Sequence, residues 1–274
     1  MFPKLLEFGA FTLPTYGVLI GLGFLAGLSV ASRLARRSGL DPERLTAMAV
    51  VLLISAIVGA KVFMFVDNWS YYAADPGRLF TLSALRSGGV FYGGLLSALV
   101  VSHFYTRRYR LPWLATADAM APGLAFGHGI GKVGCFAAGC CWGQESHAFW
   151  AVTFTDPAAH GFTGVPLNVS LHPTQLYEAL GSAAIGLVLL WLFVRAHPSG
   201  AILGSYLVLY SGFRFGVEFF RDDGARTAIF GDAISSTQLV ALGLVILGIW
   251  LLRSAPRWST PEPARAAFGR KRRR

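Results

Sequence analysis

Seven apolar runs, each close to the length of a membrane span, constrain this chain more than any other feature. A helix needs about 20 apolar residues to cross the hydrocarbon core of a bilayer. Of the 274 residues, 54% are hydrophobic and 14% are charged, with a mean hydropathy of +0.53. The runs cover residues 11–31, 45–66, 90–105, 114–131, 175–194, 201–220 and 233–252. The sequence therefore predicts one all-α integral membrane domain, a seven-transmembrane-helix bundle over residues 1–253.

Basic residues lie at alternate ends of these runs. Arginines follow the first, third and fifth runs, whereas residues 144–172 contain no Lys or Arg. Because cytoplasmic loops carry an excess of Lys and Arg, we predict an N-terminus outside and a cytoplasmic C-terminus. Residues 144–172 would then form a small external cap with a short strand or two, and residues 254–274 a basic cytoplasmic tail. The first run is too long for a signal peptide, so we expect it to remain as the first helix.

The formal net charge of +10 raises the question of nucleic-acid binding. A nucleic-acid surface gathers Lys and Arg on one face, with aromatic residues between them. Here the basic residues cluster at the ends of apolar runs, and the basic run at 270–274 is typical of a terminus beside anionic lipid. We therefore expect no nucleic acid among the partners.

Charged side chains inside predicted helices mark a candidate site, because a charge in a bilayer is costly unless it faces a cavity or a partner. The sixth predicted helix carries Arg214, Glu218 and Arg221, at offsets of four and three that place them on one helical face. Two interpretations are open. Glu218 neutralises the two arginines and ties helices together, or the group forms a cationic pocket for a lipid phosphate.

Further polar candidates lie on other predicted helices. Lys61 is in the second and Lys132 at the external end of the fourth. The fifth begins with His172, Gln175 and Glu178, which are spaced by one helical turn. These residues extend the candidate site over several helices.

Glycine is concentrated in two segments, 88–94 and 127–143. Small residues allow close packing of helices, which explains such clusters without any further role. The second cluster is denser than packing requires, so an irregular backbone lining a cavity is the alternative.

All three cysteines of the chain, Cys135, Cys140 and Cys141, lie in the second glycine cluster. Three interpretations are open. A disulfide at the external face would leave one thiol over. A zinc site with His128 or His172 would lack the usual paired C-x2-C spacing. Alternatively, the thiols pack as small buried side chains.

Taken together, these landmarks resemble the prolipoprotein diacylglyceryl transferase family between residues 16 and 252. The most specific matches are the run His172-Pro-Thr-Gln-Leu-Tyr-Glu178 and the pair Phe213-Arg214 followed by Glu218-Phe-Phe-Arg221. Other matching motifs are Tyr16-Gly17, Gly59-Ala60-Lys61, Gly88 to Gly94 with Tyr92 at a variable position, and Gly131 to Phe136 followed by Trp142-Gly143. The resemblance thus covers nearly the whole membrane part.

The chain departs from the family pattern at its signature. The family has Gly-Arg-x-Gly-Asn, and this chain has Gly-Lys-x-Gly-Cys, with Lys132 and Cys135. Ala138 and Cys140 stand where Asn and Glu are common in the family. Lysine neutralises a phosphate but cannot hold it with a bidentate fork.

The resemblance implies transfer of a diacylglyceryl group from phosphatidylglycerol to the lipobox cysteine thiol of a preprolipoprotein, with release of glycerol phosphate. It implies the bacterial inner membrane, phosphatidylglycerol, lipoprotein signal peptides and membrane lipids as location and partners, with no cofactor and no metal. The alternatives are a paralogue that uses another acceptor and a catalytically inactive lipid-binding membrane protein.

The resemblance also assigns site residues. Lys132 and Arg221 are catalytic candidates because the leaving phosphate must be stabilised by cations. Tyr92 is a third, in positioning or hydrogen bonding, since a phenol is a poor base at neutral pH. The candidates for substrate binding are Lys132, Arg221, Arg214, Glu218, His172, Gln175, Glu178, Tyr16, Gly143, Lys61 and Cys135.

Overall fold

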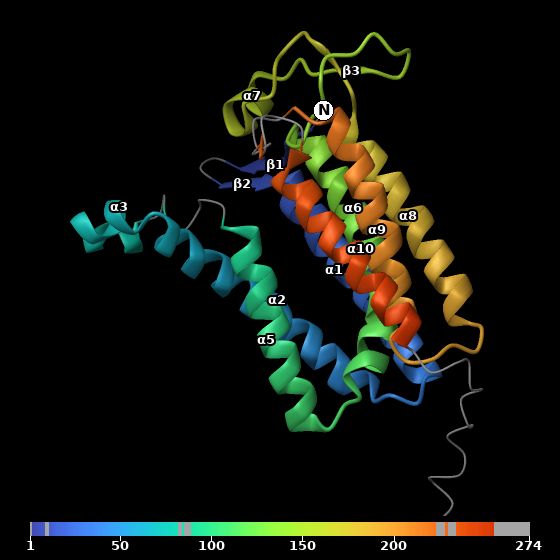
Figure 1. Ribbon diagram of the computed structural model, residues 1–274. Helices are drawn as coiled ribbons and strands as arrows, with labels where there is room; N and C mark the ends of the chain where they lie inside the picture. The colour runs from blue at the N-terminus through green and yellow to red at the C-terminus, as the bar shows by residue number, and fades with distance from the viewer. Residues whose placement is uncertain are drawn as a thin grey trace, which may run out of the picture. The chain divides into compact units, whose positions relative to one another are not determined.

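A computed structural model describes residues 2–8, 11–81, 84, 89–222, 228–229 and 234–254. The chain forms two compact units, one made of Met1–Leu34 and Ala117–Arg274 and the other of Ala35–Thr116. Both units are built mainly from long helices (Figure 1).

The larger unit contains most of α1 (Thr15–Arg37) and of α6 (Trp113–Ala138), together with α8 (Thr174–Phe193), α9 (Ala201–Val217) and α10 (Ser236–Ser254). α9 packs against both α8 and α10 (Figure 1). Strands β1 (Lys4–Phe8) and β2 (Phe11–Pro14) form an antiparallel pair before α1. A second short pair, β5 (Ala228–Ile229) and β6 (Ile234–Ser235), precedes α10.

One buried carboxylate fixes the start of α9 against α6. Asp118 on α6 is 1% exposed, and its two oxygens accept hydrogen bonds from the backbone N–H groups of Gly200 (2.6 Å) and Leu203 (2.8 Å). The first N–H groups of a helix have no partner within the helix, so a carboxylate at this end satisfies them. Asp118 thereby anchors the helix that carries Arg214.

The smaller unit contains α2 (Pro42–Asp67), α3 (Trp69–Ala74), the short 3-10 helix η1 (Pro76–Phe80) and α5 (Phe91–Tyr109). Asp41 begins α2 as an N-cap, since its carboxylate accepts hydrogen bonds from the backbone of Glu43 and Arg44. α2 and α5 pack closely through glycine: a Cβ at Gly94 would lie 2.9 Å from the Ala56 carbonyl oxygen.

A long helix stands at each of the seven predicted positions, as α1, α2, α5, α6, α8, α9 and α10. Within the described residues, four of these helices are long and apolar enough to cross a membrane: α1, α2, α8 and α10. α9 has only 17 residues, and α5 and α6 carry more glycine and polar side chains. The chain is thus an all-α membrane protein, as predicted.

Two predicted helix starts are wrong. The first run begins as strand β2, and α1 starts only at Thr15, because residues 11–14 pair with β1 and Pro14 disfavours a helical backbone at Leu13. The last helix begins at Ser236 and not at residue 233, since residues 234–235 belong to β6.

The alternative of an irregular backbone does not hold for residues 131–138, because α6 continues as a helix to Ala138, whereas the chain leaves the helix at Gly139, whose φ is 82°. Its glycines lie against neighbouring backbones. A Cβ at Gly127 would lie 2.8 Å from the Gly23 carbonyl oxygen of α1, and one at Gly129 would lie 3.0 Å from the Ala179 carbonyl oxygen of α8. Close helix packing therefore explains this part of the glycine cluster.

The segment predicted as a cap, 144–172, folds over a small core that includes Phe154, Val165 and Leu171. It contains β3 (Val152–Thr153), which pairs with β4 (Ser170–Leu171), and the helix α7 (Pro157–Thr163). The predicted short strands are confirmed. Of the predicted tail, 254–274, only Ser254 belongs to the described residues.

We expect Gly27→Ala to destabilise the larger unit, because the new Cβ would lie 2.5 Å from the Gly123 carbonyl oxygen of α6. Overpacking of this kind costs about 1–3 kcal/mol. Gly21→Ala is a matched control on the same helix, since no atom lies within 4 Å of its added Cβ. Thermal unfolding in detergent micelles should show a lower midpoint for Gly27→Ala only; equal midpoints for the two variants would contradict the α1–α6 packing.

Candidate active site

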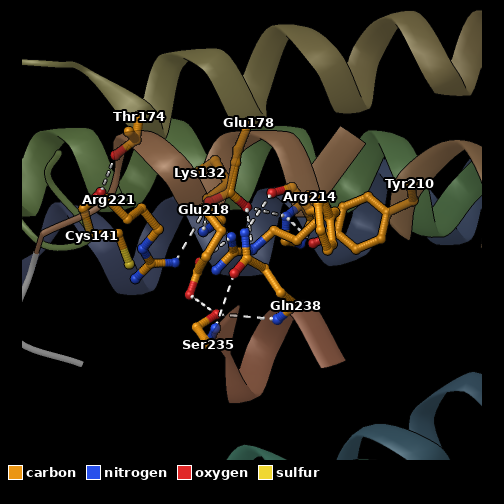
Figure 2. Close-up of polar contacts among 12 residues, drawn as sticks. Lys132, Cys141, Thr174, Glu178, Tyr210, Arg214, Glu218, Arg221, Ser235 and Gln238 are labelled. Atoms are coloured by element: carbon orange, nitrogen blue, oxygen red, sulfur yellow. Dashed lines mark hydrogen bonds and ion pairs between the residues drawn. The ribbon is translucent and has the colours of Figure 1, made fainter. Parts of the chain in front are cut away.

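Four side chains surround one buried carboxylate in the larger unit, and three of them, Lys132, Arg214 and Arg221, are labelled in Figure 2. Glu178, near the start of α8, is 1% exposed. Its Oε1 lies 2.9 Å from Lys132 Nζ and 3.7 Å from Arg221 Nη1. Its Oε2 lies 3.4 Å from His128 Nε2 and 3.9 Å from Arg214 Nε. One glutamate thus joins α6, α8, α9 and the segment after α9.

The predicted single helical face of Arg214, Glu218 and Arg221 is wrong beyond Glu218. α9 ends at Val217, the 3-10 helix η2 (Glu218–Phe220) follows, and Arg221 is extended, at φ −86° and ψ 143°. Arg214 Nη1 lies 2.6 Å from Glu218 Oε2, whereas Arg221 turns to Glu178. Glu218 therefore neutralises Arg214, and Glu178 is the carboxylate that links the two arginines.

Two further buried residues hold Glu218 in place. Ser235, before α10, donates a hydrogen bond from Oγ to Glu218 Oε1 (2.7 Å), and its backbone N–H donates to Gln238 Oε1 (3.0 Å; Figure 2). Ser235 and Gln238 are 0% and 1% exposed. No sequence motif marked these residues, because their role depends on how α10 packs against the end of α9.

The structure adds Tyr210 to the candidate site and places His128 beside Glu178 and Tyr210. Tyr210 Oη lies 3.1 Å from His128 Nε2, and the two rings meet edge to face at 5.2 Å between centroids. The sequence had marked His128 only as a possible zinc ligand. Tyr210 stands four residues before Arg214, so the one-turn spacing was a signal that could have found it.

The charges of this cluster do not cancel. Lys132, Arg214 and Arg221 are three basic side chains against the two carboxylates of Glu178 and Glu218, which leaves a surplus of one positive charge without counting His128. The three basic side chains are only 11–12% exposed. Because screening by water is weak at such depth, the cluster favours a ligand with one negative charge.

Gly143 connects this cluster to the cap segment. Its N–H donates to the His172 carbonyl oxygen (3.0 Å), and its backbone pairs with that of Arg221 as an isolated bridge. A Cβ at this position would lie 2.7 Å from the Cβ of His172. Only glycine allows this approach, so Gly143 positions Arg221 through its backbone.

His172 belongs to a chain of hydrogen bonds at the base of the cap segment. Trp150 Nε1 donates to Tyr177 Oη (2.6 Å), which lies 2.9 Å from His172 Nδ1. His172 is thereby oriented by Tyr177 and also packs on the Phe220 ring at 5.2 Å.

Gln175 and Thr174, at the start of α8, hold the turn that follows α6. Gln175 Nε2 donates to the Cys140 carbonyl oxygen (2.8 Å), and Thr174 Oγ1 donates to that of Cys141 (2.6 Å). Both side chains are 0% exposed. Gln175 Oε1 is buried without a hydrogen-bond partner among the described residues.

The three cysteines are free thiols whose sulfur atoms all lie within 4.8 Å of one another. Of the three interpretations left open, the disulfide is not formed, and neither His128 nor His172 belongs to this group of thiols.

Tyr16 lies on α1 against the same end of α6, since a Cβ at Gly134 would lie 3.4 Å from its Cδ2. The phenol is within electrostatic range of all three cysteines. Tyr92 and Lys61 belong to the smaller unit, where Lys61 Nζ donates to the Ala84 carbonyl oxygen (2.8 Å). Their roles beside the larger unit's cluster stay predictions.

These features define a helical membrane protein with a buried, positively charged polar site. Residues 3–254 match the family model of prolipoprotein diacylglyceryl transferase. The chain belongs to the prolipoprotein diacylglyceryl transferase family, which confirms the resemblance seen in its motifs.

Relatives from distant bacteria match over nearly their whole length. The phosphatidylglycerol–prolipoprotein diacylglyceryl transferase of Photobacterium profundum is 30% identical over 263 residues, 93% of this chain and 95% of the relative. Those of Vibrio cholerae and Clostridium tetani are 32% and 29% identical, over 91% and 92% of this chain and 90% and 96% of the relative.

Proposed function

We propose that this chain transfers a diacylglyceryl group from phosphatidylglycerol to the cysteine thiol of a prolipoprotein and releases glycerol phosphate. The observation that carries the proposal is the buried surplus of one positive charge around Glu178. The phosphodiester of phosphatidylglycerol has one negative charge and matches that surplus. The names of the relatives supply the donor and the acceptor.

The reaction makes demands that the cluster can meet. The thiolate of the acceptor attacks a glyceryl carbon, an S–C bond forms, a C–O bond breaks, and the thiol proton leaves with the glycerol phosphate. Negative charge grows on the leaving phosphate, where Lys132 and Arg221 act as the catalytic cations. Glu178 holds both at fixed positions, 2.9 Å and 3.7 Å from one oxygen.

The other residues have supporting roles in this proposal. Arg214 and Glu218 form the far wall of the phosphate site, and Gly143 and His172 position Arg221 and the cap segment. Tyr92 and Lys61, which belong to the smaller unit, stay candidates from the sequence motifs, with Tyr92 as a hydrogen-bonding residue for a substrate.

We further propose that all seven long helices cross the bacterial inner membrane, with the N-terminus outside and the C-terminus in the cytoplasm. Basic residues support this topology, since Arg36 and Arg37 end α1, Arg107 and Arg108 lie in the last turn of α5, and Arg253 in that of α10. The cap segment, which lacks Lys and Arg, would then face outside together with the start of α8.

The proposal is tested with the purified protein in micelles that contain phosphatidylglycerol and a lipobox peptide. We expect the peptide to gain the mass of a diacylglyceryl group while glycerol phosphate is released in equal amount. A peptide with serine in place of its cysteine is the matched control and should stay unmodified. No product, in conditions where the Vibrio cholerae relative is active, would overturn the proposal and favour another acceptor or a lipid-binding role.

A further inference from the structure

The three thiols beside the proposed site form a set of ligands that the charge cluster does not use. Cys135 lies in the last turn of α6 and is 8% exposed, and Cys140 and Cys141 follow the helix and are partly exposed. The chain has no other cysteine. All three sulfur atoms lie within 4.8 Å of one another.

This spacing suits a single metal ion. With zinc–sulfur bonds of about 2.3 Å, sulfur atoms around one tetrahedral Zn²⁺ lie about 3.8 Å apart. The thiols therefore need to approach by about 1 Å at most from their 4.8 Å limit. Thiolate ligands select Zn²⁺ and other thiophilic ions over Mg²⁺ or Ca²⁺.

The turn that carries Cys140 and Cys141 is held by hydrogen bonds from the start of α8. Gly139 and Cys141 both have a left-handed backbone, with φ of 82° and 62°, which turns the chain sharply after α6. Thr174 and Gln175 bind the carbonyl oxygens of Cys141 and Cys140. Gln175 Oε1, buried and without a described hydrogen-bond partner, is a polar atom left over at the edge of the cluster.

The surrounding charge favours a metal held by three thiolates. Such a complex with Zn²⁺ carries one net negative charge. Lys132 and Arg221 lie within electrostatic range of Cys141, and Lys132 also of Cys135 (Figure 2). Cys140 and Cys141 are partly exposed, so water screens part of that charge, and the surplus around Glu178 is kept for the phosphate of the proposed function.

We propose that Cys135, Cys140 and Cys141 bind one Zn²⁺ ion through three thiolates and leave a fourth position for the acceptor thiol. A zinc site with three protein ligands keeps a position open for a substrate, and a thiol that coordinates zinc loses its proton. The metal thereby supplies the thiolate for S–C bond formation, and the released proton leaves with the glycerol phosphate. This second part rests on the proposed function, whereas metal binding does not.

Binding is tested with full-length protein in detergent micelles, reduced, stripped by a chelator and titrated with Co²⁺. We expect one Co²⁺ per chain, with a sulfur-to-cobalt charge-transfer band that Zn²⁺ abolishes. The triple variant Cys135→Ser, Cys140→Ser, Cys141→Ser should lose the band, and Cys140→Ser alone should weaken it. His147→Ala removes an exposed imidazole from the same segment and should bind as the wild type does.

Two results would overturn metal binding: no band in wild-type protein with three titratable thiols, or an unchanged band in the triple variant. The fourth position is tested by adding the lipobox peptide to the Co²⁺ form, where a stronger band is expected with the cysteine peptide and not with its serine variant. Equal rates of lipidation by stripped and Zn²⁺-loaded protein would overturn the activating role. A spectral change without any lipidated product would instead contradict the proposed function and leave the metal site standing.

Discussion

Glu178→Ala is expected to lower lipidation of a lipobox peptide by more than about 100-fold, comparable to the loss of an essential electrostatic group. The carboxylate lies within 4 Å of four basic or ionisable side chains, and its removal leaves Lys132, Arg214 and Arg221 with Glu218 alone. Breaking a buried ion pair from one side costs about 3–5 kcal/mol. Product mass and thermal unfolding in micelles measure the two effects.

Two further variants test whether the effect comes from the charge of Glu178. One keeps the size of that side chain, and the other removes a glutamate elsewhere. Glu178→Gln keeps the size of the side chain, so it should lose activity with a smaller loss of stability. Glu145→Gln changes an exposed glutamate of the cap segment and should resemble the wild type in both measurements. Wild-type activity in a folded Glu178→Ala protein would show that the carboxylate does not organise the site.

Lys132→Ala should also reduce lipidation by more than about 100-fold, since it removes the cation nearest to Glu178 and one of two that face the leaving phosphate. Lys132→Arg should keep activity within about tenfold, because a guanidinium also binds phosphate and carboxylate. Initial rates of lipidation at saturating phosphatidylglycerol provide the comparison. Lys4→Ala, which removes an exposed ion pair with Glu7, is the control and should have no effect.

Arg221 provides an independent test of the same assignment. Arg221→Ala should act in the same direction as Lys132→Ala, and the two losses should not add, because both cations lie beside the same oxygen of Glu178. Retained lipidation in both single variants would remove the phosphate site from this cluster.

The long helices and most residues of the charge cluster could be predicted from the sequence. Apolar runs of spanning length indicate helices, and Lys132, Glu178, Arg214 and Arg221 stood out because charges are rare in such runs. The central position of Glu178 could not be predicted. Spacings of three and four residues indicate neighbours on one helix, whereas the partners of Glu178 lie on α6, on α9 and in the segment after α9.

The glycines of α6 show a second limit. Gly127 and Gly129 are needed where backbones touch, yet the same residues would also permit an irregular segment. Only the packing of α1 and α8 decides between these outcomes. The role of the three cysteines could not be predicted for the same reason, because spacing along the chain does not say whether three sulfur atoms lie close together.

The base of the cap segment is closed by paired backbone hydrogen bonds. Gly143 N–H donates to the His172 carbonyl oxygen, and His172 N–H donates to that of Gln144 (2.9 Å). The two chain segments that connect the cap to the helices are thus paired by backbone hydrogen bonds at the base of the cap. Residues 145–171 therefore leave and return through one stem, and that stem lies next to Arg221, whose backbone pairs with Gly143.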